Sequence, residues 1–265
     1  MTRTHLAPLT PIQQLRAGRT ARRLVQLAVG LTLYGVSMGM MVRSRLGLDP
    51  WDVFHYGVAA HLPVSFGTVV IIVGALVLLL WIPLRQWPGL GTVSNVVIIG
   101  LATDATLGLL SSPTSLPARA GLLVGGILLN GLAGALYIGS QFGPGPRDGL
   151  MTGLARRTGG SIRLVRTSIE LTVLAVGWLM GGVVGVGTVL YALLIGPTVQ
   201  ALLPVFTVSL ASGSGESASA VEGQGEGQDG WRARVTQRLR RHGERPARAG
   251  HVVDEQHGAV EPAQC

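Results

Sequence analysis

Long apolar stretches alternate with short polar loops along most of this chain. Six stretches reach the length of about 20 residues that a helix needs to cross a hydrocarbon core of about 30 Å. They are residues 24–42, 66–84, 90–111, 120–140, 164–183 and 186–208. Two further segments, 51–62 and 147–160, are too short and too polar to span and suit re-entrant or interfacial half-helices. The pattern predicts an all-α polytopic membrane protein with six transmembrane helices.

Two blocks of the sequence recur at one fixed offset of 96 residues (146 − 50). The ten identities exceed the roughly two or three expected from ordinary residue usage. We interpret them as an internal duplication. The matched residues are Gly47/Gly143, Pro50/Pro146, Asp52/Asp148, Gly57/Gly153, Gly89/Gly185, Gly91/Gly187, Thr92/Thr188, Val93/Val189, Ile99/Ile195 and Gly100/Gly196.

Arginine supplies all 21 basic residues, and its distribution predicts the orientation. Five arginines precede the first span, five lie between the fourth and fifth spans, and seven follow the sixth. The positive-inside rule places these segments, and so both termini, in the cytoplasm. The predicted location is the plasma membrane. Each copy of the duplication holds three spans, so the second copy must be inverted. Inverted repeats are typical of secondary transporters that bind substrate at the repeat interface.

Each predicted half-helix follows a loop with a proline and an aspartate. Proline suits the first helical position, and a carboxylate in the first turn is favoured by the helix dipole. Simple helix capping is the alternative interpretation. As gates, the two N-termini would favour an anionic ligand, above all at Arg147, whose counterpart is Trp51. The candidate binding or gating residues here are Asp49, Pro50, Trp51, Asp52, Pro146, Arg147 and Asp148.

Glycine–threonine pairs open the third and sixth spans, as Gly91-Thr92 and Gly187-Thr188. They permit close approach of a ligand or of another helix, and helix packing is the alternative to binding. Inside the spans, Asp104 and Glu170 are functional candidates, because an uncompensated charge there costs several kcal/mol. Glu170 has a local partner in Arg166, four residues earlier, so a structural ion pair is the alternative for this residue.

Composition supports a membrane protein with a polar tail. Hydrophobic residues make up 48% of the chain, charged residues 13%, and mean hydropathy is +0.46. Residues 212–230 contain too few apolar groups to fold and form a linker within a disordered tail, 211–265. A solvated tail is favoured over contact of its seven arginines with anionic lipid. Eight acidic residues balance those arginines, which disfavours nucleic-acid binding. The single cysteine, Cys265, excludes an intramolecular disulfide and a cysteine-based metal cluster.

Four motifs in order carry a resemblance to a known family. They are Arg45-Leu46-Gly47-Leu48-Asp49-Pro50-Trp51-Asp52-Val53, Gly-Leu-Gly-Thr-Val at 89–93, Gly-Pro-Arg-Asp-Gly-Leu at 145–150 and Gly-Val-Gly-Thr-Val at 185–189. Over residues 24–208 the chain resembles the YczE/YyaS group of bacterial integral membrane proteins, related to the YitT group. The resemblance implies a polytopic plasma-membrane protein, and some members of the group are placed with exporters of antibiotics or other secondary metabolites.

The predicted organisation is a basic segment (1–23), a first repeat (24–111), a connecting loop (112–119), a second repeat (120–210) and a cytoplasmic tail (211–265). The predicted function is secondary transport or export of a small organic molecule, without cofactor or metal. A non-transporting membrane regulator or scaffold is the alternative. No enzyme motif is present in the sequence, and without an ATP-binding motif transport needs an ion gradient or a separate ATPase.

Overall fold

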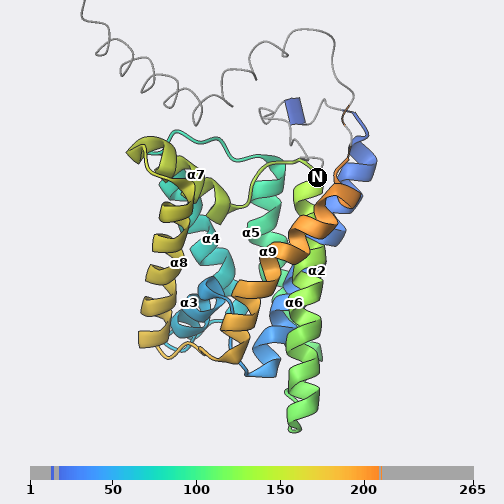
Figure 1. The fold of residues 1–265 in the computed structure, drawn as a ribbon, viewed down its shortest axis with the longest axis vertical. Coiled ribbons are helices and arrows are strands. Elements are labelled where there is room, and N and C mark those ends of the chain that lie inside the picture. The colour runs from blue at the N-terminus through green and yellow to red at the C-terminus, as the bar shows by residue number, and fades with distance from the viewer. Residues whose placement is uncertain (1–12, 15–17, 209, 211–265) are drawn as a thin grey trace, which may run out of the picture. The chain divides into compact units, whose positions relative to one another are not determined.

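The structure, a computed structural model, describes residues 13–14, 18–208 and 210. Within them it is all-helical, without strands, as the apolar pattern predicts (Figure 1). Predictions for the tail 211–265 lie outside the described residues. The main helices are α2 (Thr20–Ser44), α3 (Pro50–Ala59), α4 (Phe66–Trp81), α5 (Leu90–Leu109), α6 (Leu116–Gly139), α7 (Pro146–Thr158), α8 (Ile162–Leu179) and α9 (Val186–Phe206).

Four of these helices, α2, α5, α6 and α9, are long and apolar enough to cross a membrane. The other two predicted spans are weaker by this measure. Helix α4 is apolar but has only 16 residues, and α8 carries three charged residues within its 18 positions. The two short segments are helices as well, α3 and α7, and both begin at the predicted proline.

Every one of these helices in the first half has a counterpart that begins 96 residues later, as Thr20 and Leu116 do (116 − 20). Side-chain contacts recur at the same offset. Arg23 Nε donates to the carbonyl oxygen of Ser140 at 2.8 Å, and its counterpart Arg119 donates to that of Ser44, also at 2.8 Å. Each arginine therefore satisfies a carbonyl at the C-terminal end of the other long helix, which sets α2 and α6 antiparallel. Arg23, the last residue of the predicted basic segment, belongs to α2 and is fully buried.

The two glycine–threonine motifs hold the loops that lead into the half-helices. Gly91 N donates to the carbonyl of Phe142 at 2.9 Å, and Gly187 N donates to that of Leu46 at 2.8 Å. Each loop then turns at a glycine with positive φ, 119° at Gly47 and 108° at its counterpart, a conformation that side chains disfavour. Each motif thus supports the half-helix loop of the other copy.

The helices form two groups, which we call the long-helix bundle (α2, α5, α6, α9) and the half-helix bundle (α3, α4, α7, α8). In the long-helix bundle α2 packs on α5 and α6, and α6 packs on α9. In the half-helix bundle α3 packs on α8 and α4, and α7 on the same two helices. Figure 1 shows the two half-helices within their bundle, α7 above α3.

The two bundles meet closely along α4 and α5, whereas the counterpart pair, α8 and α9, has at most marginal contact over the described residues. Glycines permit the close packing of α4 on α5, because a Cβ on Gly67 would lie 2.0 Å from the carbonyl oxygen of Gly100. The counterpart positions are Arg163 and Gly196, and nothing lies within 4 Å of a Cβ on Gly196. The molecule is therefore symmetric in its helices but asymmetric in this contact.

Candidate functional site

The N-terminal ends of the two half-helices point at each other and position the site. At α3, the side chain of Asp49 accepts hydrogen bonds from Trp51 N (2.9 Å) and Asp52 N (3.1 Å), and Pro50 takes the first helical position. The N-cap of α3 is therefore Asp49, whereas the sequence offered the capping alternative for Asp52 and its counterpart Asp148. At α7, Gly145 stands at the cap position without a side-chain bond. The loops before α3 and α7 thus bring the first turns of the two helices close to each other.

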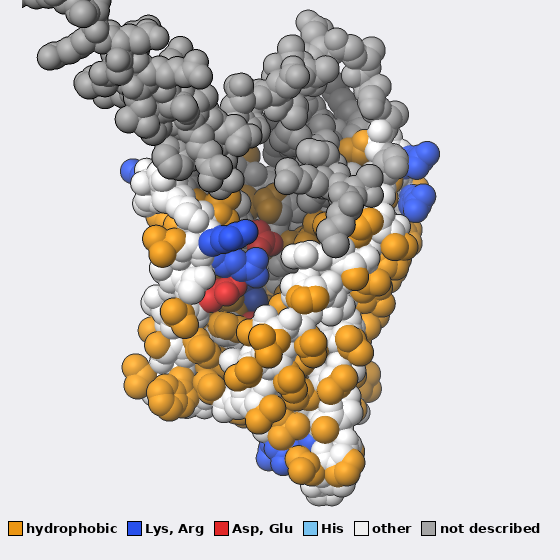
Figure 2. Space-filling view, in the orientation of Figure 1, with side chains coloured by type: hydrophobic (Ala, Val, Ile, Leu, Met, Phe, Trp, Pro, Cys, Tyr) orange, Lys and Arg blue, Asp and Glu red, His pale blue; other side chains and the backbone are white. Residues whose placement is uncertain are grey.

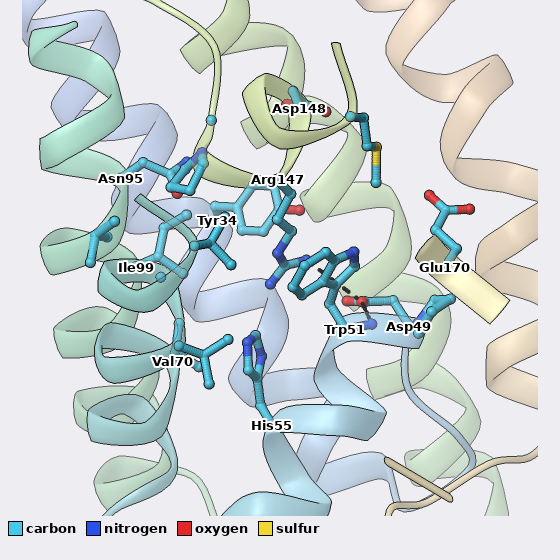
Figure 3. Close-up of a pocket in the computed structure, with 18 of the residues that line it drawn as sticks. Tyr34, Asp49, Trp51, His55, Val70, Asn95, Ile99, Arg147, Asp148 and Glu170 are labelled. Atoms are coloured by element: carbon cyan, nitrogen blue, oxygen red, sulfur yellow. Dashed lines mark hydrogen bonds and ion pairs between the residues drawn. The ribbon is translucent and has the colours of Figure 1, made fainter. Parts of the chain in front are cut away.

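Arg147 of α7 reaches across to α3 and forms the centre of the site (Figure 3). Its two terminal nitrogens lie 3.7 Å from an oxygen of Asp49 and 3.7 Å from an oxygen of Asp52. Its guanidinium carbon lies 5.1 Å from the centre of the Trp51 ring, within reach of a cation–π contact. The two predicted gating loops, 96 residues apart in sequence, thus form one ion-pair cluster.

These charged side chains are largely buried, so their desolvation destabilises the fold unless each charge is paired with an opposite one. Asp49 is 2% exposed, Asp52 is fully buried, and the Arg147 side chain is 25% exposed. His55 Nδ1 lies 3.1 Å from Asp52 Oδ1, so this ring nitrogen can donate to the carboxylate. Removing one ion from such a cluster leaves the others buried and unpaired.

A cavity of about 130 Å³ opens beside Arg147 and is lined by both bundles. Five predicted site residues from the half-helix loops line it beside Arg147: Asp49, Pro50, Trp51, Pro146 and Asp148. Asp52 stands behind them, paired with Arg147. The long-helix bundle contributes Tyr34, Asn95, Val96, Ile99, Tyr137 and Tyr191. An aromatic and carboxylate-rich cavity between two bundles suits a small ligand.

The α7 side of the cavity is fixed by hydrogen bonds from other helices. Tyr137 Oη donates to Asp148 at 3.2 Å and accepts from Gly145 N at 2.9 Å. Trp81 Nε1 donates to the carbonyl of Pro146 at 3.1 Å. The start of α7 is therefore held by α6 and α4 together, while the Asp148 side chain remains exposed.

Glu170 also lines the cavity, on α8, and accepts a hydrogen bond from Arg166 Nε at 2.9 Å, the predicted local ion pair. Figure 2 shows basic and acidic side chains gathered in a hollow of this face, at the place where α8 and α9 lie in Figure 1. The counterparts of Arg166 and Glu170 on α4 are Val70 and Gly74, which line the same cavity from the side where α4 packs on α5. Charged side chains on α8 thus stand where the contact between the bundles is at most marginal.

Asp104 lies outside this site. One carboxylate oxygen accepts from Gly67 N at 2.7 Å and the other from the hydroxyl of Ser65, so Asp104 caps the start of α4 from α5. The motif residues Gly91, Thr92, Gly187 and Thr188 do not line the cavity either. They pack closely, as in the packing alternative, but against a loop and not against another helix.

Several residues that line the cavity lie outside the sequence motifs and were not predicted as site residues. They are Tyr34, His55, Asn95, Tyr137 and Tyr191. One signal in the sequence could have found two of them. At the offset of 96, Asn95 corresponds to Tyr191 (191 − 95), a polar residue opposite a polar residue inside two predicted spans. Tyr191 Oη in turn donates to Asn130 Oδ1 at 3.1 Å, and Asn130 is the counterpart of Tyr34 (130 − 34).

Comparison with known proteins places this architecture in a family. A model described as a family of unknown function, DUF6198, matches residues 21–204. An uncharacterised protein of Haemophilus influenzae is 41% identical over 179 residues, which cover 68% of this chain and 82% of that protein. The uncharacterised membrane protein YczE of Bacillus subtilis is 35% identical over 177 residues, covering 66% and 82%.

A further relative, the uncharacterised protein YyaS of Bacillus subtilis, is 24% identical over 184 residues, which cover 67% of this chain and 90% of that protein. No solved structure matches. The resemblance to the YczE/YyaS group is confirmed, and with four helices apolar enough to span, the protein is a membrane protein. The chain belongs to the DUF6198 family of unknown function.

Proposed function

We propose that the protein is a secondary transporter of a small organic molecule, built from two inverted repeats of three spans and one half-helix each. Antiparallel packing of α2 against its counterpart α6 supports the inversion. The eight helix starts, which fall into four pairs at one offset, support the duplication itself. In this proposal α4 and α8 complete the six crossings of a bacterial plasma membrane, and both termini are cytoplasmic.

The ion-pair cluster beside the cavity carries the proposal. Asp49 and Asp52 from one repeat face Arg147 from the other at the start of two opposed half-helices. Inverted-repeat transporters bind substrate at such a place, where discontinuous helices begin near the midplane. Buried ionisable groups inside a membrane are costly and mark ion or substrate pathways. A scaffold would need neither the charges nor the cavity.

The asymmetry between the two sides supports a two-state cycle. In this conformation the bundles are closed along α4 and α5 and parted along α8 and α9. Inversion of the repeats makes the exchanged conformation, closed along α8–α9 and open along α4–α5, equivalent in its backbone. Alternating access of this kind needs only rocking of one bundle against the other around a fixed site.

A disulfide test measures the exchanged conformation directly. Cysteines at positions 163 and 196, in a Cys265→Ser background, are the counterparts of the closely packed Gly67 and Gly100. We expect Arg163→Cys/Gly196→Cys to form a disulfide under mild oxidation, because closure of α8 on α9 brings the two Cα atoms within about 7 Å. Mobility on non-reducing gels, after cleavage between the two positions, measures the cross-link.

The matched control pairs Arg163→Cys with Gly121→Cys, since nothing lies within 4 Å of a Cβ on Gly121. This control should stay reduced. Complete absence of the 163–196 disulfide in membranes, with both thiols reactive towards maleimide, would count against alternating access and favour the scaffold alternative.

Topology gives a second test. In the same background, an impermeant maleimide should label His61→Cys from outside and Arg157→Cys only after permeabilisation, because the arginine bias places the α7–α8 side in the cytoplasm. Both side chains are exposed. Labelling of the two positions from the same side would exclude the inverted arrangement.

A further inference from the structure

The charge of the site is opposite to what Arg147 alone suggests. Taken by itself, this arginine at a helix N-terminus favours an anionic ligand. The structure sets it against two carboxyl groups, so the formal charge of the buried cluster is −1. Asp148 and Glu170 add two further carboxylates to the cavity wall, against one further arginine, Arg166. An anion entering this cavity would meet net repulsion.

Arg147 also leaves the carboxylates incompletely satisfied. Both of its ion-pair distances, 3.7 Å, exceed the length of a hydrogen bond. Arg147 is therefore held by electrostatic attraction and not by hydrogen bonds to the two carboxylates. Asp49 Oδ2 and Asp52 Oδ2 are buried without any hydrogen-bond partner in the described part of the chain. Asp49 lines the cavity while only 2% exposed. Buried carboxylate oxygens are normally hydrogen-bonded, so these two lack a donor.

The aromatic residues complete a site for a cation. The Trp51 ring already receives the Arg147 guanidinium on its face, 5.1 Å from the ring centre. Tyr34, Tyr137 and Tyr191 line the same cavity from the long-helix bundle. Carboxylates beside aromatic faces are the groups by which proteins recognise ammonium and guanidinium ions. Arg147 therefore occupies the place of a ligand while tethered to α7.

We propose that the cavity binds a small organic cation of the guanidinium or ammonium class, which takes the place of Arg147 between Asp49, Asp52 and the Trp51 ring. This inference rests on the proposed transport function and names its substrate class. The cavity of about 130 Å³ is close in volume to an engineered cavity of roughly 150 Å³ that holds benzene. It therefore has room for one small cationic group.

The test uses the full chain in lipid nanodiscs with radiolabelled methylguanidinium as the probe. Methylammonium should compete for the site. N-methylurea, which has nearly the same shape without the charge, should not compete, and neither should benzoate. Saturable methylguanidinium binding with this order of competition supports the cation site.

Two variants should change methylguanidinium affinity in opposite directions. Asp49→Asn keeps the helix cap, because Asn caps as well as Asp, but removes the excess charge; it should weaken binding at least tenfold. Arg147→Gln removes the tethered competitor and should strengthen binding at least tenfold. Arg156→Gln, an exposed arginine on the same helix, is the matched control and should leave affinity unchanged. If Arg147→Gln does not fold, Asp49→Asn decides by itself.

Other results overturn the assignment. They are absence of saturable cation binding, equal competition by N-methylurea, or benzoate binding that Arg147→Gln abolishes. The last result would make the substrate an anion and leave the transport proposal standing. Conversely, methylguanidinium that binds as expected but shows no gradient-driven flux in proteoliposomes would reject transport while keeping the cation site.

Discussion

Replacement of Arg147 by Ala should destabilise the fold by about 3–5 kcal/mol, the usual cost of removing one partner from a buried ion pair. Asp49 and Asp52 would then face each other in a site that is nearly closed to water, without a counter-charge. The loss of the guanidinium from the Trp51 face adds to this cost. The free energy of unfolding, measured by SDS titration in mixed micelles, gives the effect.

Two companion variants separate charge from packing in this experiment. Arg147→Ala combined with Asp49→Asn and Asp52→Asn should recover most of the loss, because no buried charge remains unpaired. Arg156→Ala, on the exposed side of α7, should change stability by at most about 0.5 kcal/mol. If Arg147→Ala proved as stable as Arg156→Ala, the ion pairs would contribute nothing to the fold, and the triple variant should then show no gain.

Gly149→Val should destabilise the protein by about 3 kcal/mol through overpacking against Trp81. A Cβ on Gly149 would lie 1.9 Å from Cζ2 of this buried ring, which cannot move without losing its bond to the carbonyl of Pro146. The start of α7 would therefore shift, and Arg147 with it. Unfolding in mixed micelles measures stability, and Trp fluorescence follows the ring.

The other repeat suggests a compensating change. The counterparts of Gly149 and Trp81 are Val53 and Gly177, so the large residue and the glycine have exchanged helices. A Cβ on Gly177 would lie 2.6 Å from the carbonyl carbon of Val53. Gly149→Val together with Trp81→Gly recreates that pair. We expect a coupling of about 2 kcal/mol between the two substitutions, within the range of contacting residues.

Gly121→Val serves as the control for adding a valine to a helix, since nothing lies near its Cβ. It should cost less than about 1 kcal/mol. Additive effects of Gly149→Val and Trp81→Gly, with no coupling, would show that the two repeats do not share this packing solution.

Local features of the sequence predicted the elements well. The starts at Phe66, Leu90 and Val186 follow from hydropathy, and the half-helices from their prolines and acidic first turns. The offset of 96 residues recurs in all four pairs of helix starts. These features depend on neighbouring residues and on one duplication, both of which a single sequence displays.

The tertiary structure decided which distant residues meet. The sequence offered Arg147 as an anion-binding group, but the structure sets it 3.7 Å from the carboxylates of Asp49 and Asp52. It also made Asp104 a cap of α4 and gave the two sides of the molecule unequal contacts. Apolar helix faces pack in many registers of similar energy, and hydropathy does not distinguish among them. Contacts between residues almost 100 positions apart therefore depend on which glycines permit close approach, a choice that only the packed bundles reveal.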